Sequence, residues 1–339
     1  MGPLQSPQIW QIASALGLAG NGSPVDAVLR YCDARVHNIL ADFPECTSPA
    51  ELLLIMAAML GTSFEEVHSD EGLIELQDRY CKVGEFGFAS LQKDLDGEAY
   101  GVTYRRLAIV HGERAFVSVI DCRGNKALRS YFTKWHELGH LLILTDQQRQ
   151  NLRRTHSPEI QKDPEEALID AIAGQMGFHS RFLLPEIRSV VSFAEIDRIR
   201  AKLFPEASFQ ASANAYAKNH VAPCLLIEAK LALKKVEQAE LLQGSFVFFE
   251  PATPRLRVQT AVASTMAKKH GLYIPRNFRV PEASIVHQVF TDGRGQGDAL
   301  ESLSLWESSD GKFLRPMPIH IEVRKHFGSV IALISDSPD

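Results

Sequence analysis

The sequence predicts an α+β protein with more than one domain, and three observations support this prediction. The chain has 339 residues, which is more than one small domain usually needs. Apolar residues recur at helix period in residues 8–80 and 186–240, whereas residues 84–121 and 245–339 are rich in β-branched and aromatic residues. Hydrophobic residues make up 45% of the chain and charged residues 23%, as in globular proteins with a sizeable core.

Composition and charge argue against several classes of protein. The net charge of −5 gives no wide basic surface, so direct nucleic-acid binding is not expected. Five cysteines without a C-x-x-C pair disfavour a disulfide framework or a cysteine zinc site. The N-terminus lacks the pattern of a signal peptide, and the longest apolar run, 52–60, is far shorter than the ~20 residues that span a bilayer. We therefore expect a cytoplasmic protein that does not contact membranes.

An N-terminal helical region is expected over residues 1–80. Three Ser-Pro pairs, at Ser6, Ser23 and Ser48, each precede a segment with helical periodicity. Serine is a favourable N-cap and proline a favourable first helical residue, so each pair predicts the start of a helix. The run 52–60 is expected to form a core helix.

A second region, residues 81–190, is expected to combine a small sheet with two helices. Strands are predicted within 86–92, 99–110 and 115–121, and the last of these leads into a helix that contains "YFTKWHELGHLLIL", 131–144. A polar, basic stretch, 145–164, predicts a surface loop. Pro164 is well placed to begin the next helix.

The remainder is expected to form a helical segment over 191–242 and an α/β domain over 243–339. In the latter, strands are predicted at 245–250, 255–263, 319–325 and 329–335, the last two joined as a hairpin. The glycine-rich stretch 292–298 lacks the Lys-[Ser/Thr] pair of a phosphate-binding loop and predicts an ordinary turn.

The stretch "HELGH" carries the strongest chemical signal. His136 and His140 are four residues apart, so a helix places them on one face, offset by about 40°, where both imidazoles can bind one metal ion. Glu137 is turned away by about 100° and is placed to accept a proton from activated water instead of binding the metal. This H-E-x-x-H pattern predicts a zinc site with Glu137 as the general base. Gly139 would allow a strand or a substrate to approach the helix closely.

A catalytic zinc site needs a third protein ligand, which must come from elsewhere in the chain. Glu166 is the preferred candidate, with Asp170 one turn later placed to hydrogen-bond the outer nitrogen of a ligating histidine. Glu165, His156 and His179 are the alternatives. Tyr131 is expected to serve the core, and no residue is identified as the oxyanion stabiliser.

These motifs resemble the ImmA/IrrE family of zinc metallopeptidases. The family pattern R-F-T-x-A-H-E-x-G-H followed by E-x-x-A-[ND]-x-F-A is similar to "YFTKWHELGH" and "EALIDAIA" here. The resemblance covers about 85–185 and implies a zincin-like core, with zinc bound by His136, His140 and Glu166. Trp135 stands where the family has a small residue, and Leu144 where many members have histidine.

The resemblance implies a zinc-dependent endopeptidase that cleaves a specific protein, namely a helix-turn-helix repressor, in a stress, defence or mobile-element response. It also implies that 191–242 could be helix-turn-helix-like and that 243–339 could be a GAF-like sensory domain with a small-molecule ligand. The alternative is a regulatory binding protein that keeps the peptidase fold and sequesters its partner without efficient cleavage. A general housekeeping protease ranks lowest, because the resemblance is to selective regulators.

Overall fold

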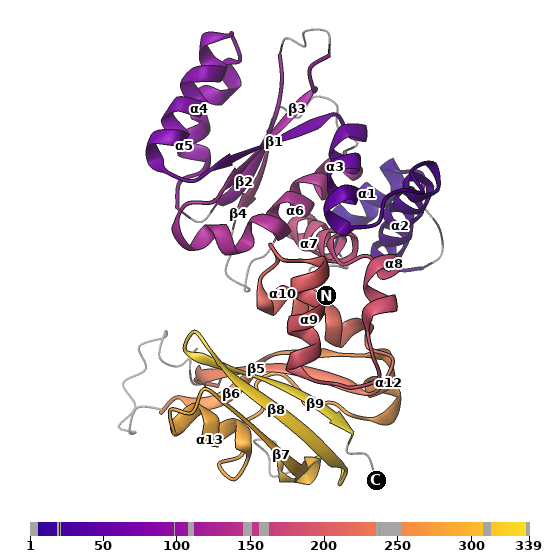
Figure 1. Ribbon diagram of the computed structural model, residues 1–339, viewed down its shortest axis with the longest axis vertical. Helices are drawn as coiled ribbons and strands as arrows, with labels where there is room; N and C mark the ends of the chain where they lie inside the picture. Colours follow the sequence, from indigo (N-terminus) through magenta and orange to yellow (C-terminus); the bar gives the residue numbers. More distant parts are fainter. Residues whose placement is uncertain are drawn as a thin grey trace. The chain divides into compact units, whose positions relative to one another are not determined.

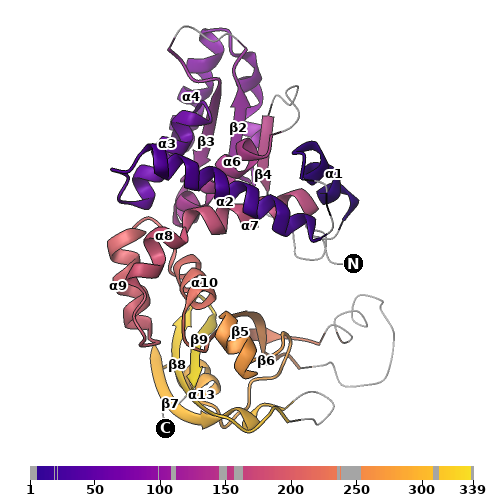
Figure 2. The same ribbon diagram turned by 90° about the vertical axis from the view of Figure 1, so that its right-hand side faces the viewer.

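The computed structural model forms two compact units, each with its own sheet (Figures 1 and 2). It describes residues 6–18, 20, 22–97, 99–107, 112–144, 151–155, 163–234, 237, 253–307 and 313–336. Unit 1 comprises Met1–Leu183 and Arg200–Ser212, and unit 2 comprises Leu184–Ile199 and Ala213–Asp339. The units therefore interleave along the chain and do not follow the four consecutive ranges 1–80, 81–190, 191–242 and 243–339.

The first three helices begin at the predicted Ser-Pro pairs. They are α1 (Pro7–Ala15), α2 (Pro24–Asp42) and α3 (Pro49–Met59). In each, the serine hydroxyl accepts a hydrogen bond from the backbone N–H three residues later, which satisfies a donor that the helix leaves unpaired. The prediction of these three starts is confirmed.

Unit 1 contains a four-stranded sheet in the order β1-β3-β2-β4. Its strands are β1 (Thr62–Val67), β2 (Ala99–Arg105), β3 (Phe116–Asp121) and β4 (Asn151–Thr155). β1 lies parallel to β3, and β2 is antiparallel to both β3 and β4. The predictions of strands within 99–110 and 115–121 are confirmed.

Three local predictions in unit 1 are wrong. The helical region 1–80 contains strand β1, because Gly61 adopts the left-handed conformation after α3 and the next six residues pair with β3. The loop predicted at 145–164 contains β4, and its other residues before Asp163 lie outside the described ranges. Residues 86–92 form no strand: Phe86–Ser90 is a 3₁₀ turn and α5 (Leu91–Asp94) follows it, with Phe88 and Leu91 buried.

The two faces of this sheet differ in polarity. On one face, α4 (Asp70–Lys82) and α5 cover an apolar surface (Figure 1), to which Val102, Tyr104, Val117 and Val119 contribute. The alternate residues Gly101 and Thr103 contact α6 (Ser130–Leu142) on the opposite face. The helix with the HELGH motif therefore packs on the polar face.

Helix α7 (Pro164–Gly177) packs against α6 on one side and against α1 and α2 on another, and α2 runs alongside it in Figure 2. Asp163 is its N-cap and Pro164 its first residue, which confirms the predicted start. The short helix α8 (Ser180–Leu183) follows.

Unit 2 contains an antiparallel five-stranded sheet in the order β6-β5-β9-β8-β7. Its strands are β5 (Cys224–Ala232), β6 (Arg255–Ala263), β7 (Gln296–Ser302), β8 (Pro318–His326) and β9 (Ser329–Asp336). Strand β6 and the β8–β9 hairpin confirm predictions, whereas the strand predicted at 245–250 lies outside the described residues. The helical expectation for 191–242 holds for α9 (Phe193–Leu203) and α10 (Phe209–Asn219) but is wrong for β5. A short apolar run such as "CLLI" is compatible with either a helix or a strand. Here pairing with β6 and β9 makes this segment a strand.

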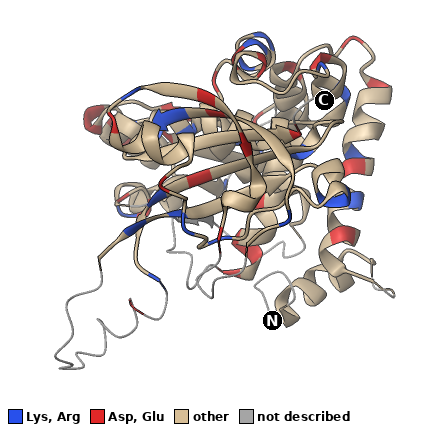
Figure 3. Ribbon diagram, turned by 90° about the horizontal axis from the view of Figure 1, so that it is seen from below, with Lys and Arg blue, Asp and Glu red and all other residues tan. Residues whose placement is uncertain are grey.

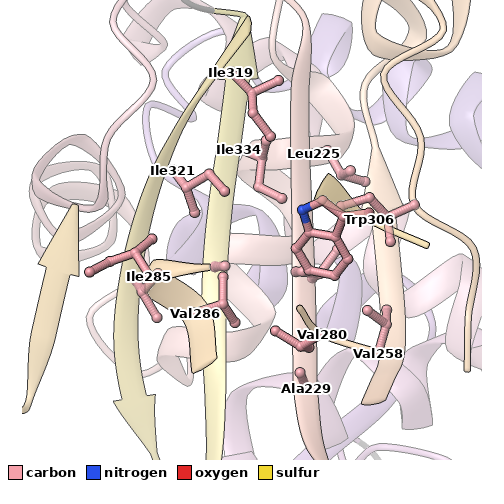
Figure 4. Close-up of a cluster of buried hydrophobic side chains, with 14 of the residues drawn as sticks. Leu225, Ala229, Val258, Val280, Ile285, Val286, Trp306, Ile319, Ile321 and Ile334 are labelled. Carbon is pink, nitrogen blue, oxygen red and sulfur yellow. The ribbon is translucent and has the colours of Figure 1, made fainter. Parts of the chain in front are cut away.

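One face of this sheet packs against α12 (Thr265–His270), α13 (Ile285–Thr291) and the buried Trp306. Figure 4 shows the indole among apolar side chains of strands β5, β6, β8 and β9, helix α13 and the segment that carries Val280. The labelled residues are Leu225, Ala229, Val258, Val280, Ile285, Val286, Ile319, Ile321 and Ile334.

The apolar run 52–60 lies mainly in α3, where Leu52, Leu53 and Met56 are buried, as expected of a core helix. Within the described ranges, no helix combines the length and the apolar character needed to cross a membrane.

Asp121, at the end of β3, is a buried acid in an ion-pair network. Its carboxylate accepts hydrogen bonds from Arg123 Nη2 at 2.8 Å and Lys126 Nζ at 2.7 Å, and its side chain is buried. Burial alone would raise the pKa of Asp121, but the hydrogen bonds from Arg123 and Lys126 outweigh burial and hold the pKa below its ordinary value of 3.8.

We predict that Asp121→Asn lowers the free energy of unfolding at pH 7 by about 3 kcal/mol, the low end of the cost of breaking a buried ion pair. Since folding lowers this pKa, the stabilisation is complete above pH 3.8 and is lost as the pH falls further. Urea unfolding at several pH values should show the two proteins converging in acid. Asp70→Asn is the control, because Asp70 contacts the same Arg123 but is 80% exposed, and it should cost less than about 1 kcal/mol. Equal losses in both variants would contradict this account.

Candidate metal centre

Helix α6 places two histidines on its buried face. His136 and His140 are 1% and 4% exposed, and their ring centroids lie 4.9 Å apart, as the spacing of four residues predicts. Neither Nε2 atom forms a hydrogen bond within the described part of the chain, although both are buried. Buried imidazole nitrogens normally have partners, so these two atoms indicate a site for a bound group.

Glu166 of α7 supplies the third side chain. Its Oε2 lies 3.2 Å from Nε2 of His136, and its Oε1 lies 3.3 Å from Nε2 of His140. Burial raises the pKa of Glu166, but the imidazoles of His136 and His140 outweigh burial and lower the pKa to about 2. The carboxylate is therefore ionised at neutral pH, as a metal ligand must be.

The donor set fits a divalent ion. One donor atom from each of His136, His140 and Glu166 lies within 4.8 Å of the others, so the three side chains could hold a metal ion. Ligand atoms about 2.0–2.1 Å from a tetrahedral zinc ion are about 3.3 Å from one another, close to the two nitrogen–oxygen separations here. Two imidazoles and one carboxylate are also a common zinc ligand set.

Two acidic residues of α7 lie near the Nδ1 atoms of the imidazoles, the outer nitrogens that do not face Glu166. Asp170 Oδ1 is 2.9 Å from Nδ1 of His136, so that nitrogen donates its proton to the Asp170 carboxylate, and Nε2 is the nitrogen that faces Glu166. Glu165 Oε1 is 3.8 Å from Nδ1 of His140, beyond hydrogen-bond distance. Glu165, the alternative third ligand, thus lies beside the outer nitrogen of His140, and the structure brings Glu166 to the Nε2 atoms.

Glu137 is directed toward the sheet and is fully buried. Thr103 of β2 donates a hydrogen bond to its Oε2 at 2.7 Å. The Thr103 hydroxyl also contacts Ser118 at 2.7 Å, and Ser118 contacts Thr62 at 3.0 Å. This row of buried hydroxyls across β2, β3 and β1 was not predicted, because it depends on strand pairing. The alternation of small polar residues with valine in β2 and β3 was the available signal.

Gly139 allows two helices to approach closely. A Cβ atom at this position would lie 3.1 Å from Cγ2 of Ile169 on α7. The sequence predicted a close approach at Gly139 but assigned it to a strand or a substrate, whereas the structure places helix α7 there. The close contact brings Glu166 over the face of α6 that bears the histidines.

The other candidate residues from the sequence are not part of the group formed by His136, His140 and Glu166. His179 is buried, with Nε2 3.3 Å from Asp33, and His156 lies outside the described residues. Tyr131 is buried and donates a hydrogen bond to the carbonyl of Gly177, as expected of a core residue. Trp135 is also buried and packs directly on Gly177 of α7.

A second group of side chains in unit 1 has residue types that can bind metals, but its surroundings disfavour metal binding. Donor atoms of Glu66, His68 and Cys122 lie within 4.8 Å of one another, yet Lys134 Nζ already contacts the Glu66 carboxylate at 2.8 Å. Burial raises the pKa of the Cys122 thiol to about 11, which disfavours the thiolate that binds metals. The ammonium group of Lys134 thus already neutralises the carboxylate.

Comparison with known proteins adds little to this geometry. The chain matches no family model and no curated protein. Among solved structures it is similar to one titled "Mycobacterium tuberculosis transcriptional regulator", at 10% sequence identity and a TM-score of 0.45. That similarity covers 98% of this chain and 81% of the other.

We predict that Asp170→Asn reduces zinc affinity about 10- to 100-fold without abolishing binding, because the amide no longer holds the His136 ring in its ligating orientation as an anion does. His136→Ala and Glu166→Ala should remove binding. Competition with a chromophoric chelator measures the affinity, and circular dichroism checks folding. Asp170→Asn with wild-type affinity would rule out this supporting role.

Two helical glycines allow a matched test of the α6–α7 contact. Gly139→Ala should lower zinc affinity, because its methyl group must displace Ile169 and the helix that carries Glu166. Gly174→Ala has no contact closer than 4.0 Å, so it should keep zinc affinity and gain up to about 1 kcal/mol of stability from helix propensity. Chelator competition and thermal unfolding measure the two quantities. Identical zinc affinities would show that the close approach at Gly139 does not position Glu166.

Proposed function

We propose that this protein is a zinc-dependent endopeptidase. The observation that carries the proposal is the group formed by the buried His136 and His140 and the partly buried Glu166, in which both Nε2 atoms lack hydrogen bonds and face one carboxylate. The similarity of the two sequence motifs to the ImmA/IrrE family supports the same activity. Zinc is proposed because two imidazoles and a carboxylate match its preferred ligands.

In the proposed reaction, the residues of the chain have separate roles. His136, His140 and Glu166 would hold the zinc ion, which would supply Lewis acidity to a peptide carbonyl and to water. Glu137 accepts the proton of the attacking water and delivers it to the departing amine. Thr103 holds the Glu137 carboxylate through the hydrogen bond to Oε2, and Asp170 holds the His136 ring.

The proposed substrate is a specific protein, a helix-turn-helix repressor, cleaved in a stress, defence or mobile-element response. Support for this substrate comes from the family resemblance of the motifs. Repressors encoded by genes adjacent to the one that encodes this chain are the first candidates to test.

The burial of Glu137 favours a second candidate function. A general base must reach the reacting water, yet Glu137 is fully buried and bonded to Thr103. A peptidase-fold protein that uses its metal for stability and sequesters a repressor would have this feature. The two functions differ in whether the repressor is cut.

We predict that Glu137→Gln retains zinc and loses cleavage by about 10²- to 10⁴-fold, the contribution of a general acid–base residue. The experiment incubates purified protein with each candidate repressor, with and without a zinc chelator, and identifies fragments by mass spectrometry. Glu71→Gln, an exposed carboxylate on α4, is the control and should cleave normally. Cleavage by Glu137→Gln at the normal rate would exclude the mechanism, and stable complexes without fragments would support the binding function instead.

A further inference from the structure

A cavity of about 670 Å³ in unit 2 is lined by several basic side chains. Three are arginines: Arg255 and Arg257 on β6, and Arg279 on the segment that pairs with the edge of β6. Figure 3 shows that basic and acidic residues are otherwise interspersed along the elements. Three arginines therefore share the lining of one cavity.

Arg257 is the central residue of this group. It is 4% exposed, and its Nη1 donates to the backbone carbonyl of Asn277 at 3.1 Å. Its Nε has no hydrogen-bond partner within the described residues. A guanidinium remains charged at all relevant pH values, and a buried charge without a counter-ion is costly. The unpartnered donor indicates that an anion completes the site.

The carboxylates in the same cavity do not satisfy Arg257. Glu282 contacts Arg279, and its Oε1 lies 3.8 Å from Arg255 Nη1, so two guanidinium groups share one carboxylate. Glu237, Glu307 and Lys234 also line the cavity, and Glu237 accepts a hydrogen bond from the Lys234 backbone N–H at 2.6 Å. Among the described residues, four basic and three acidic side chains line the cavity, so these residues carry one positive charge in excess.

A neighbouring cavity of about 750 Å³ shares two lining residues, Ala283 and Leu305, with the first. Apolar side chains such as Ile285, Leu300 and Met317 line much of it. The two cavities thus form adjoining polar and apolar compartments, a pattern that suits a ligand with an anionic group and an apolar part.

We propose that these compartments bind a small organic oxyanion, with Arg257 as the principal donor to its anionic group. Guanidinium groups bind phosphate and carboxylate oxygens through paired N–H donors, so either oxyanion has the required chemistry. The apolar part of the ligand lies against Ile285 and Leu300. The proposal is independent of the metal centre in unit 1.

Calorimetric titration of the full chain with phenyl phosphate, benzoate and inorganic phosphate, at an ionic strength matched with sodium chloride, tests the proposal. Phenyl phosphate or benzoate should bind more tightly than inorganic phosphate, and the tighter of the two identifies the oxyanion. Arg257→Met should weaken binding about tenfold or more, since a charge-assisted hydrogen bond is lost. Lys230→Gln is the matched control. Lys230 pairs with Arg257 from β5, is exposed and is not among the residues that line the cavity. The Lys230→Gln variant should therefore bind the probes with unchanged affinity.

Absence of binding by all three probes would overturn the proposal, as would wild-type affinity in Arg257→Met. Circular dichroism checks whether Arg257→Met folds. If it does not, the double variant Arg255→Gln/Arg279→Gln replaces the two more exposed arginines, and unchanged affinity there would equally overturn the proposal.

Discussion

The close packing of α6 against α7 is the constraint on which the candidate metal centre depends. Gly139 has no side chain, so the Ile169 turn of α7 lies directly on α6. This contact sets the distance between Glu166 and the imidazoles of His136 and His140, which are held on α6 one turn apart. A larger separation of the helices would leave two histidines without their carboxylate.

The sheet of unit 1 adds a second constraint, because its two faces serve different purposes. The apolar face of β2 and β3 builds a core with α4, and burial of its valines stabilises the unit. The opposite face carries Thr103 and Ser118, whose hydroxyls bond to each other and to Glu137. A buried carboxylate costs free energy unless it accepts hydrogen bonds, so the polar face allows Glu137 to lie where an apolar sheet would exclude it.

Two sets of buried polar groups in this protein contrast in their hydrogen bonding. The Asp121 carboxylate is fully engaged by Arg123 and Lys126, and it contributes to the stability of the fold. By contrast, the Nε2 atoms of the two α6 histidines and the Nε of Arg257 are buried without hydrogen bonds within the described residues. Folded proteins contain few such groups, and the two proposals place a metal ion beside the histidines and an anion beside Arg257.

The sequence by itself determined what depends on near neighbours in the chain: the three Ser-Pro helix starts, the β8–β9 hairpin, and the placement of His136 and His140 on one helical face. Capping, turns and helical spacing act over a few residues. Tertiary structure decided the strands β1, β4 and β5, the distances between Glu166 and the two Nε2 atoms, and the contact of Thr103 with Glu137. Strand pairing and helix packing join residues distant in sequence, so a short segment that suits both helix and strand takes the conformation its partners impose.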